Sequence, residues 1–136
     1  MNAVEAMERV TVEAGQKAVA EVRFIKVMTI GQVVRQGDIY LHRVAAEHPR
    51  GEATQNRQLA IGTTRGSRHV AEAPAEVYVG TTRPEYCDER TLLGPVVVSR
   101  ERIVVTHPEH AHYSLPAGTY QVTHQTDART LARVQD

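Results

Sequence analysis

Four of the chain's seven histidines fall within nineteen positions, in the stretch THPEHAHYSLPAGTYQVTH. They are His107, His110, His112 and His124. An imidazole can bind a transition metal, act as a general acid or base, or hydrogen-bond the backbone. The clustering therefore raises three hypotheses, which the rest of the sequence has to separate.

The first hypothesis is a metal site. In an extended segment His110 and His112 lie two residues apart and share one face. Pro108 restricts the residue before it and favours a bend that brings His107 toward His110. His69, from another segment, is the best candidate for a further ligand. The set His69, His107, His110 and His112 would suit a divalent transition metal such as zinc; otherwise no cofactor is expected.

The second hypothesis is a metal-free enzyme. Imidazoles among His69, His107 and His110 would transfer protons, while Arg68 would stabilise the developing charge, as in a phosphodiesterase or a ribonuclease-like protein. No nucleophile motif or phosphate-binding loop accompanies these residues. The chain has one Phe and no Trp, so an aromatic platform for nucleobases is not expected either.

The third hypothesis is structural. The HPEH segment would bond backbone carbonyls at a bend, with Glu109 neutralising a protonated neighbour. His42 and His48 are assigned to this same role, and His124 to a hydrogen-bonded place in the core. The protein would then be a non-catalytic binding or assembly module, and its N-terminal arm and edge strands would suit a homo-oligomer.

Composition narrows the class of protein. A chain of 136 residues suits one domain and can hold a core without disulfides or metals. Sixteen Lys and Arg balance sixteen Asp and Glu, so general nucleic-acid binding is not expected. Cys87 is the single cysteine and cannot form an intrachain disulfide. The sequence shows no signal peptide and no membrane-spanning apolar run, so we expect a cytoplasmic protein with no membrane partner.

Turn residues recur at short intervals along most of the chain, with short β-rich runs between them. This pattern predicts a mainly β fold, a compact antiparallel barrel or sandwich. Strands are expected at DIYLHRV and EVYVG. Two hairpins are also expected, one joining PVVVS to RIVVT about Arg100 and Glu101, and one joining HYSLP to TYQVTH about the PAG turn.

The sequence patterns at the two ends of the chain differ from the short β-rich runs in between. Residues 1–33 are expected to form an N-terminal arm or helix leading into a strand, and residues 34–136 the histidine-containing β domain. Near the other end, DARTLARVQD offers Asp127 as an N-cap, followed by Leu131 and Val134 at helical spacing. A short C-terminal helix is therefore expected.

Four motifs in this order carry a resemblance to a known family: QGD at 36–38, Gly66-Ser67-Arg68-His69, HPEH at 107–110 and LPAGTYQV at 115–122. Over about residues 34–136 the chain resembles a family of small bacterial and phage domains of unassigned function. Many members of that family carry GHAH where this chain has GSRH, which keeps the second histidine and replaces the first. The resemblance implies no activity. We therefore expect a small histidine-site protein, with or without a metal, acting on an unknown small molecule or a phosphodiester.

Overall fold

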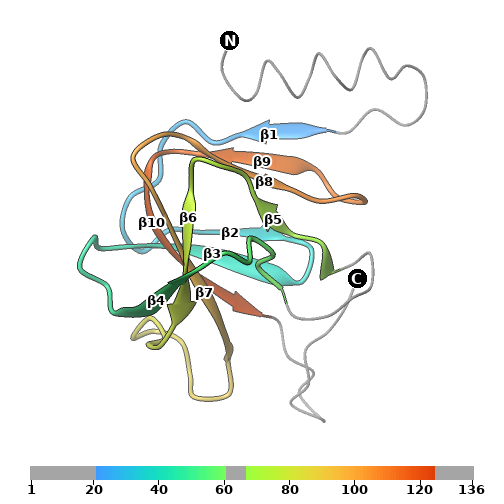
Figure 1. Ribbon diagram of the computed structural model, residues 1–136. Coiled ribbons are helices and arrows are strands. Elements are labelled where there is room, and N and C mark those ends of the chain that lie inside the picture. Colours follow the sequence, from blue (N-terminus) through green and yellow to red (C-terminus); the bar gives the residue numbers. More distant parts are fainter. Residues whose placement is uncertain (1–20, 61–66, 125–136) are drawn as a thin grey trace.

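The computed structural model describes residues 21–60 and 67–124 of the chain. In these residues ten strands form two sheets (Figure 1). The four-stranded sheet has the order β1 (Val22–Phe24), β9 (His112–Leu115), β8 (Ile103–Thr106) and β5 (Val70–Ala71). The six-stranded sheet has the order β2 (Val33–Gln36), β3 (Ile39–Val44), β10 (Gly118–His124), β7 (Leu92–Ser99), β6 (Glu76–Gly80) and β4 (Arg50–Thr54).

The mainly β class is confirmed, and within it the structure is a two-sheet sandwich instead of a closed barrel. Neighbouring strands run antiparallel except for β1 and β9, which are parallel. The strands expected at DIYLHRV and EVYVG are present as β3 and β6.

Both expected hairpins are wrong. β7 belongs to the six-stranded sheet and β8 to the four-stranded sheet, and β9 and β10 are divided in the same way. In each case a short connection carries the chain across the sandwich instead of back along the same sheet. A turn between two β-branched runs predicts that the chain reverses, but it does not say whether the second strand pairs with the first.

The two sheets share one core. Ile103 and Leu115 from the four-stranded sheet pack in the same cluster as Leu41, Val97 and Val122 from the six-stranded sheet, and all five are fully buried. Burying one such side chain contributes roughly 1.5–3 kcal/mol. The alternating strands therefore hold the two layers together through one apolar interior.

The described part of the N-terminal segment belongs to this sandwich. β1 pairs with β9, and the backbone N–H of Ile25 donates to the carbonyl oxygen of Ser114 at 2.9 Å. Met28 is buried in the core. The helix expected within residues 1–20 and the C-terminal helix expected within 127–136 lie outside the described residues. Within the part of the chain that the structure describes, no helix is long and apolar enough to cross a membrane.

Candidate functional site

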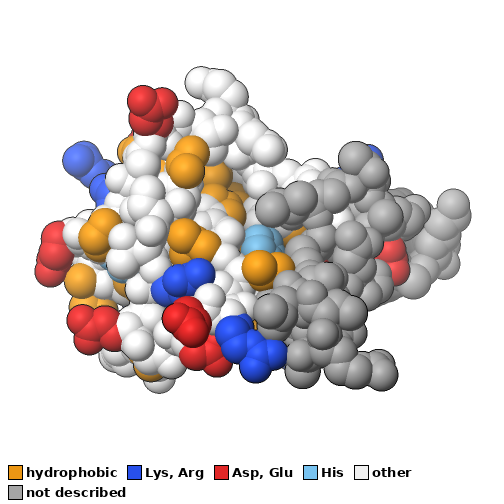
Figure 2. All heavy atoms as spheres, turned by 90° about the horizontal axis from the view of Figure 1, so that it is seen from below, with side chains coloured by type: hydrophobic (Ala, Val, Ile, Leu, Met, Phe, Trp, Pro, Cys, Tyr) orange, Lys and Arg blue, Asp and Glu red, His pale blue; other side chains and the backbone are white. Residues whose placement is uncertain are grey.

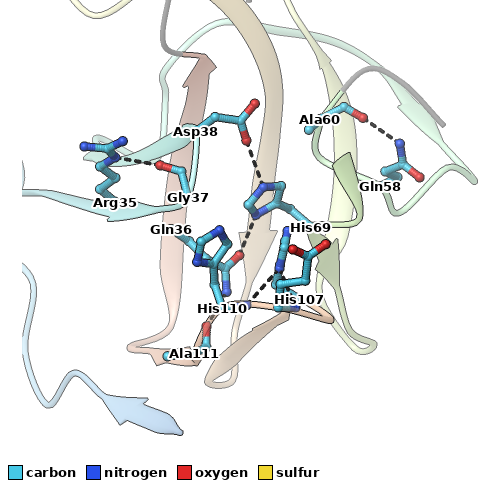
Figure 3. A network of polar contacts seen from close by, with 11 residues as sticks. Arg35, Gln36, Gly37, Asp38, Gln58, Ala60, His69, His107, His110 and Ala111 are labelled. Carbon is cyan, nitrogen blue, oxygen red and sulfur yellow. Dashed lines mark hydrogen bonds and ion pairs between the residues drawn. The ribbon is translucent and has the colours of Figure 1, made fainter. Parts of the chain in front are cut away.

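The QGD motif forms the tight turn between β2 and β3. Gln36 pairs with Ile39 across the hairpin, so Gly37 and Asp38 make a two-residue loop. Gly37 has φ of 56°, a conformation that glycine adopts without steric cost and that such loops require. The turn leaves Gln36 and Asp38 on either side of the His69 ring (Figure 3).

His69 is fully buried, and oxygen atoms face both of its ring nitrogens. Its Nδ1 lies 2.8 Å from Gln36 Oε1, and its Nε2 lies 3.0 Å from Asp38 Oδ1. The Gln36 amide is oriented by its own Nε2, which donates to the carbonyl oxygens of Val105 at 3.1 Å and Ala111 at 2.8 Å. An imidazole that donates from both nitrogens is doubly protonated. The geometry is therefore that of a His69 imidazolium paired with the Asp38 carboxylate; a neutral His69 would require a protonated Asp38.

The rings of His107 and His110 continue from His69 as a stack. The centroids of the His69 and His107 rings are 4.3 Å apart, and those of His107 and His110 are 4.6 Å apart. The Nδ1 of His107 accepts hydrogen bonds from the backbone N–H groups of Glu109 at 2.9 Å and His110 at 3.0 Å. The ring hydrogen of neutral His107 therefore sits on Nε2. The structure brings the three histidines together, as the sequence predicts.

Beside this stack lies a cavity of about 510 Å³, lined by Arg68, Val70, Thr106, His107, Pro108 and His112. The Arg68 side chain is exposed. His112 Nε2 donates to the backbone carbonyl oxygen of His107 at 3.1 Å. His112 Nδ1 is buried and has no hydrogen-bond partner in the described ranges. The residues that line the cavity thus include one guanidinium, that of Arg68, and an imidazole whose buried Nδ1 has no partner among the described residues.

The histidines as arranged do not fit a metal centre. Residues 21–60 and 67–124 contain no group of three or more His, Cys, Asp or Glu side chains placed to hold a metal. A metal needs an imidazole lone pair. Both ring nitrogens of His69 face oxygen acceptors, and the Nδ1 lone pair of His107 accepts two N–H groups. Metal binding by these two residues would require those hydrogen bonds to break.

The remaining histidines differ from one another. His48 Nε2 donates to the carbonyl oxygen of Thr82 at 3.0 Å, the backbone contact expected from the sequence. His42 instead bonds two hydroxyl groups, those of Tyr86 and Thr123. His124 is buried at the end of β10.

Sequence reasoning missed Gln36 and Asp38. The QGD motif predicts a turn, and a turn accounts for Gly37 without requiring particular side chains at its neighbours. A turn would form equally well with serine or asparagine beside the glycine. The presence of glutamine and aspartate there is the signal that could have identified these two residues. Both side chains are almost completely buried, which is rare for these residue types unless they are paired.

A second and larger cavity, of about 600 Å³, lies over β6 and β7. No Asp, Glu, Lys or Arg is among the described residues that line it. On the face in Figure 2, acidic and basic side chains of the described residues are interspersed and do not gather by sign. Of these two cavities, only the one beside His107 has an arginine, Arg68, among its described lining residues.

A family model matches residues 35–125, more than half of the chain. The chain belongs to DUF8820, a domain of unknown function. The DUF8820 match contains the QGD turn, His69 and the HPEH bend, and it begins after β1. No curated protein matches the chain, and no solved structure matches it. Membership of DUF8820 brings no activity with it, so the function has to be argued from the site.

Proposed function

We propose that this DUF8820 protein binds a small anionic ligand, of the phosphate class, in the cavity lined by Arg68, His107 and His112. The observation that carries the proposal is His112 Nδ1, a buried polar atom of a cavity-lining residue that has no partner among the described residues. Leaving such an atom unsatisfied costs about 1–3 kcal/mol. A ligand hydroxyl could donate to this nitrogen, and an anionic ligand oxygen could accept from it once the ring is doubly protonated.

The wall suits an anion for two reasons. A guanidinium binds two oxygens of a phosphate or carboxylate at once through parallel N–H groups. A doubly protonated His112 would keep its Nε2–H bond to the His107 carbonyl and donate Nδ1–H to the ligand. Arg68 and His112 would then contact the ligand. Behind them, the buried Gln36, Asp38 and His69 hold the ring of His107 in position.

A divalent metal is the second candidate, because an unprotonated His112 Nδ1 is also a potential ligand atom. The Arg68 guanidinium disfavours it, since a second positive charge in the same cavity would be repelled. Hydrolysis of a phosphodiester is a further possibility, because it needs the same binding of a phosphate group together with a general base. Binding is therefore the property to test first.

Isothermal titration calorimetry on chelator-treated protein tests the proposal, with inorganic phosphate and zinc chloride titrated separately at low salt. We expect phosphate to bind, and we expect Arg68→Ala or His112→Ala to weaken that binding at least tenfold. Arg100→Ala is the matched control, because Arg100 is exposed in the loop after β7 at the far end of β8 from Thr106. The anion proposal would be wrong if phosphate gives no heat of binding. If zinc binds instead and His112→Ala abolishes that binding, the site is a metal site. Release of nitrophenol from bis(4-nitrophenyl) phosphate, lost in Arg68→Ala, would add catalysis to binding.

A further inference from the structure

A second polar centre lies on the six-stranded sheet, around His42 of β3. His42 Nε2 is 2.8 Å from Thr123 Oγ1 on the neighbouring strand β10, and His42 Nδ1 is 2.8 Å from the hydroxyl oxygen of Tyr86. The rings of His42 and Tyr86 have centroids 5.5 Å apart. His42 is buried, whereas Tyr86 is 59% exposed. The three groups form a hydrogen-bonded chain that runs from the sheet interior to the surface.

This chain can be polarised in either direction. Burial lowers the pKa of His42, so its ring is neutral at neutral pH and has one N–H and one lone pair. The hydroxyl groups of Thr123 and Tyr86 can each donate or accept. When Tyr86 donates to His42, the Tyr86 oxygen is left as an acceptor. When His42 donates to Tyr86, the phenol hydrogen is directed outward. The exposed end of the chain therefore offers a ligand either an acceptor or a donor.

The chain opens into a cavity of about 330 Å³, lined by Tyr40, His42, Tyr86, Cys87, Thr91, Thr123 and His124. The volume is at the small end of the range for ligand sites. No Asp, Glu, Lys or Arg is among its lining residues in the described part of the chain. Burial raises the pKa of both Tyr86 and Cys87, so these two groups remain uncharged at neutral pH. The cavity thus combines two tyrosine rings with an uncharged and adaptable hydrogen-bonding centre.

We propose that this cavity is a second ligand site, for a small, planar, uncharged heteroaromatic ring. The face of the ring would lie against a tyrosine ring, and its polar edge would hydrogen-bond the Tyr86 hydroxyl. Offset or edge-to-face contacts between aromatic rings contribute about 0.5–1.5 kcal/mol beyond their buried area. A charged ligand is disfavoured, because no Asp, Glu, Lys or Arg among the described lining residues would offset its loss of hydration. This site is independent of the anion site, since the two cavities share no described residue.

Saturation-transfer NMR on the full chain tests the site with three probes at millimolar concentration: uracil, nicotinamide and cyclohexanol. Uracil and nicotinamide present planar rings with donor and acceptor groups, whereas cyclohexanol is a saturated ring of similar size. We expect transfer to at least one of the two planar rings and none to cyclohexanol. Inorganic phosphate should not compete.

Tyr86→Phe then removes the hydroxyl and keeps the aromatic wall. The dissociation constant of the planar probe should rise about three- to tenfold, which corresponds to one hydrogen bond. Tyr78→Phe is the matched control, because the Tyr78 hydroxyl donates to Glu76 Oε2 on the exposed face of β6. The proposal is overturned if neither planar probe binds, if cyclohexanol binds as well as they do, or if Tyr86→Phe leaves the affinity unchanged. Because Tyr86 is exposed and phenylalanine keeps the ring, we expect the variant to fold, and its melting temperature checks this.

Discussion

The imidazole of His107 lies against that of His69, with 4.3 Å between the ring centroids and 48° between the ring planes. His69 is itself held from both sides by Gln36 and Asp38. The position of a cavity-lining ring is therefore determined by a polar group that is completely enclosed in the protein.

Replacing His69 by Ala should lower the free energy of unfolding by about 3–5 kcal/mol, because the Asp38 carboxylate would stay buried without its ionic partner. Urea denaturation measures the loss. The double variant His69→Ala, Asp38→Ala should lose less than the sum of the two single variants, because the second change removes the stranded charge. Additive losses would show that the two side chains do not act as a pair.

His107→Ala should destabilise the HPEH bend, since two backbone N–H groups would lose their acceptor. His107→Asn offers a carbonyl oxygen near the position of Nδ1 and should recover much of the lost stability. Each hydrogen bond contributes about 0.5–1.5 kcal/mol. Thermal unfolding of both variants makes the comparison. Equal losses in the two variants would mean that the ring stack, and not the N–H contacts, holds the bend.

His42 should make stability depend on pH in a defined direction. Burial lowers its pKa in the folded state from the usual value of 6.5, so the unfolded chain binds more protons just below that pH. The contribution of His42 is therefore complete above pH 6.5 and is lost as the pH falls from there toward the folded-state pKa. Denaturation of the wild type and of His42→Gln between pH 7.5 and pH 5 should show a shallower decline in the variant. Parallel curves would contradict this assignment.

Truncation should separate two parts of the N-terminal segment. A chain that begins at residue 21 keeps β1, Met28 and the hydrogen bond of 3.1 Å from Arg43 Nη1 to the Met28 carbonyl oxygen. A chain that begins at residue 34 loses all three. We expect the shorter chain to unfold at a markedly lower denaturant concentration than the longer one. Equal midpoints would show that β1 and Met28 add nothing to the stability of the sandwich.

Local sequence patterns predicted where the strands of this fold lie better than they predicted which strands pair with each other. The alternation in DIYLHRV predicted β3, since a strand with one buried face repeats every two residues. The hairpin predictions were wrong because the connection between β7 and β8, which joins the two sheets, has the same sequence pattern as a turn within one sheet. Only contacts between distant segments distinguish the two cases.

The site was predictable to a similar extent. The motifs indicated that His69 and His107 would meet, and they do. Gln36 and Asp38 were not recognised because the QGD motif is fully accounted for by a turn. Nothing in that motif indicates that the two residues beside the glycine are buried. Likewise, nothing local to His42 indicates that Tyr86, from a distant loop, would reach its ring.

β10 lies between β3 and β7 in the six-stranded sheet, although it is the last of the described strands along the chain. Until residues 118–124 have left the ribosome, the β2–β3 ribbon and the β4–β6–β7 ribbon have no strand to join them. Synthesis must therefore run almost to the end of the described chain before this sheet can close. Until then, the edge strands of both halves have unpaired backbone groups. These groups can bind chaperones or pair with strands of other nascent chains.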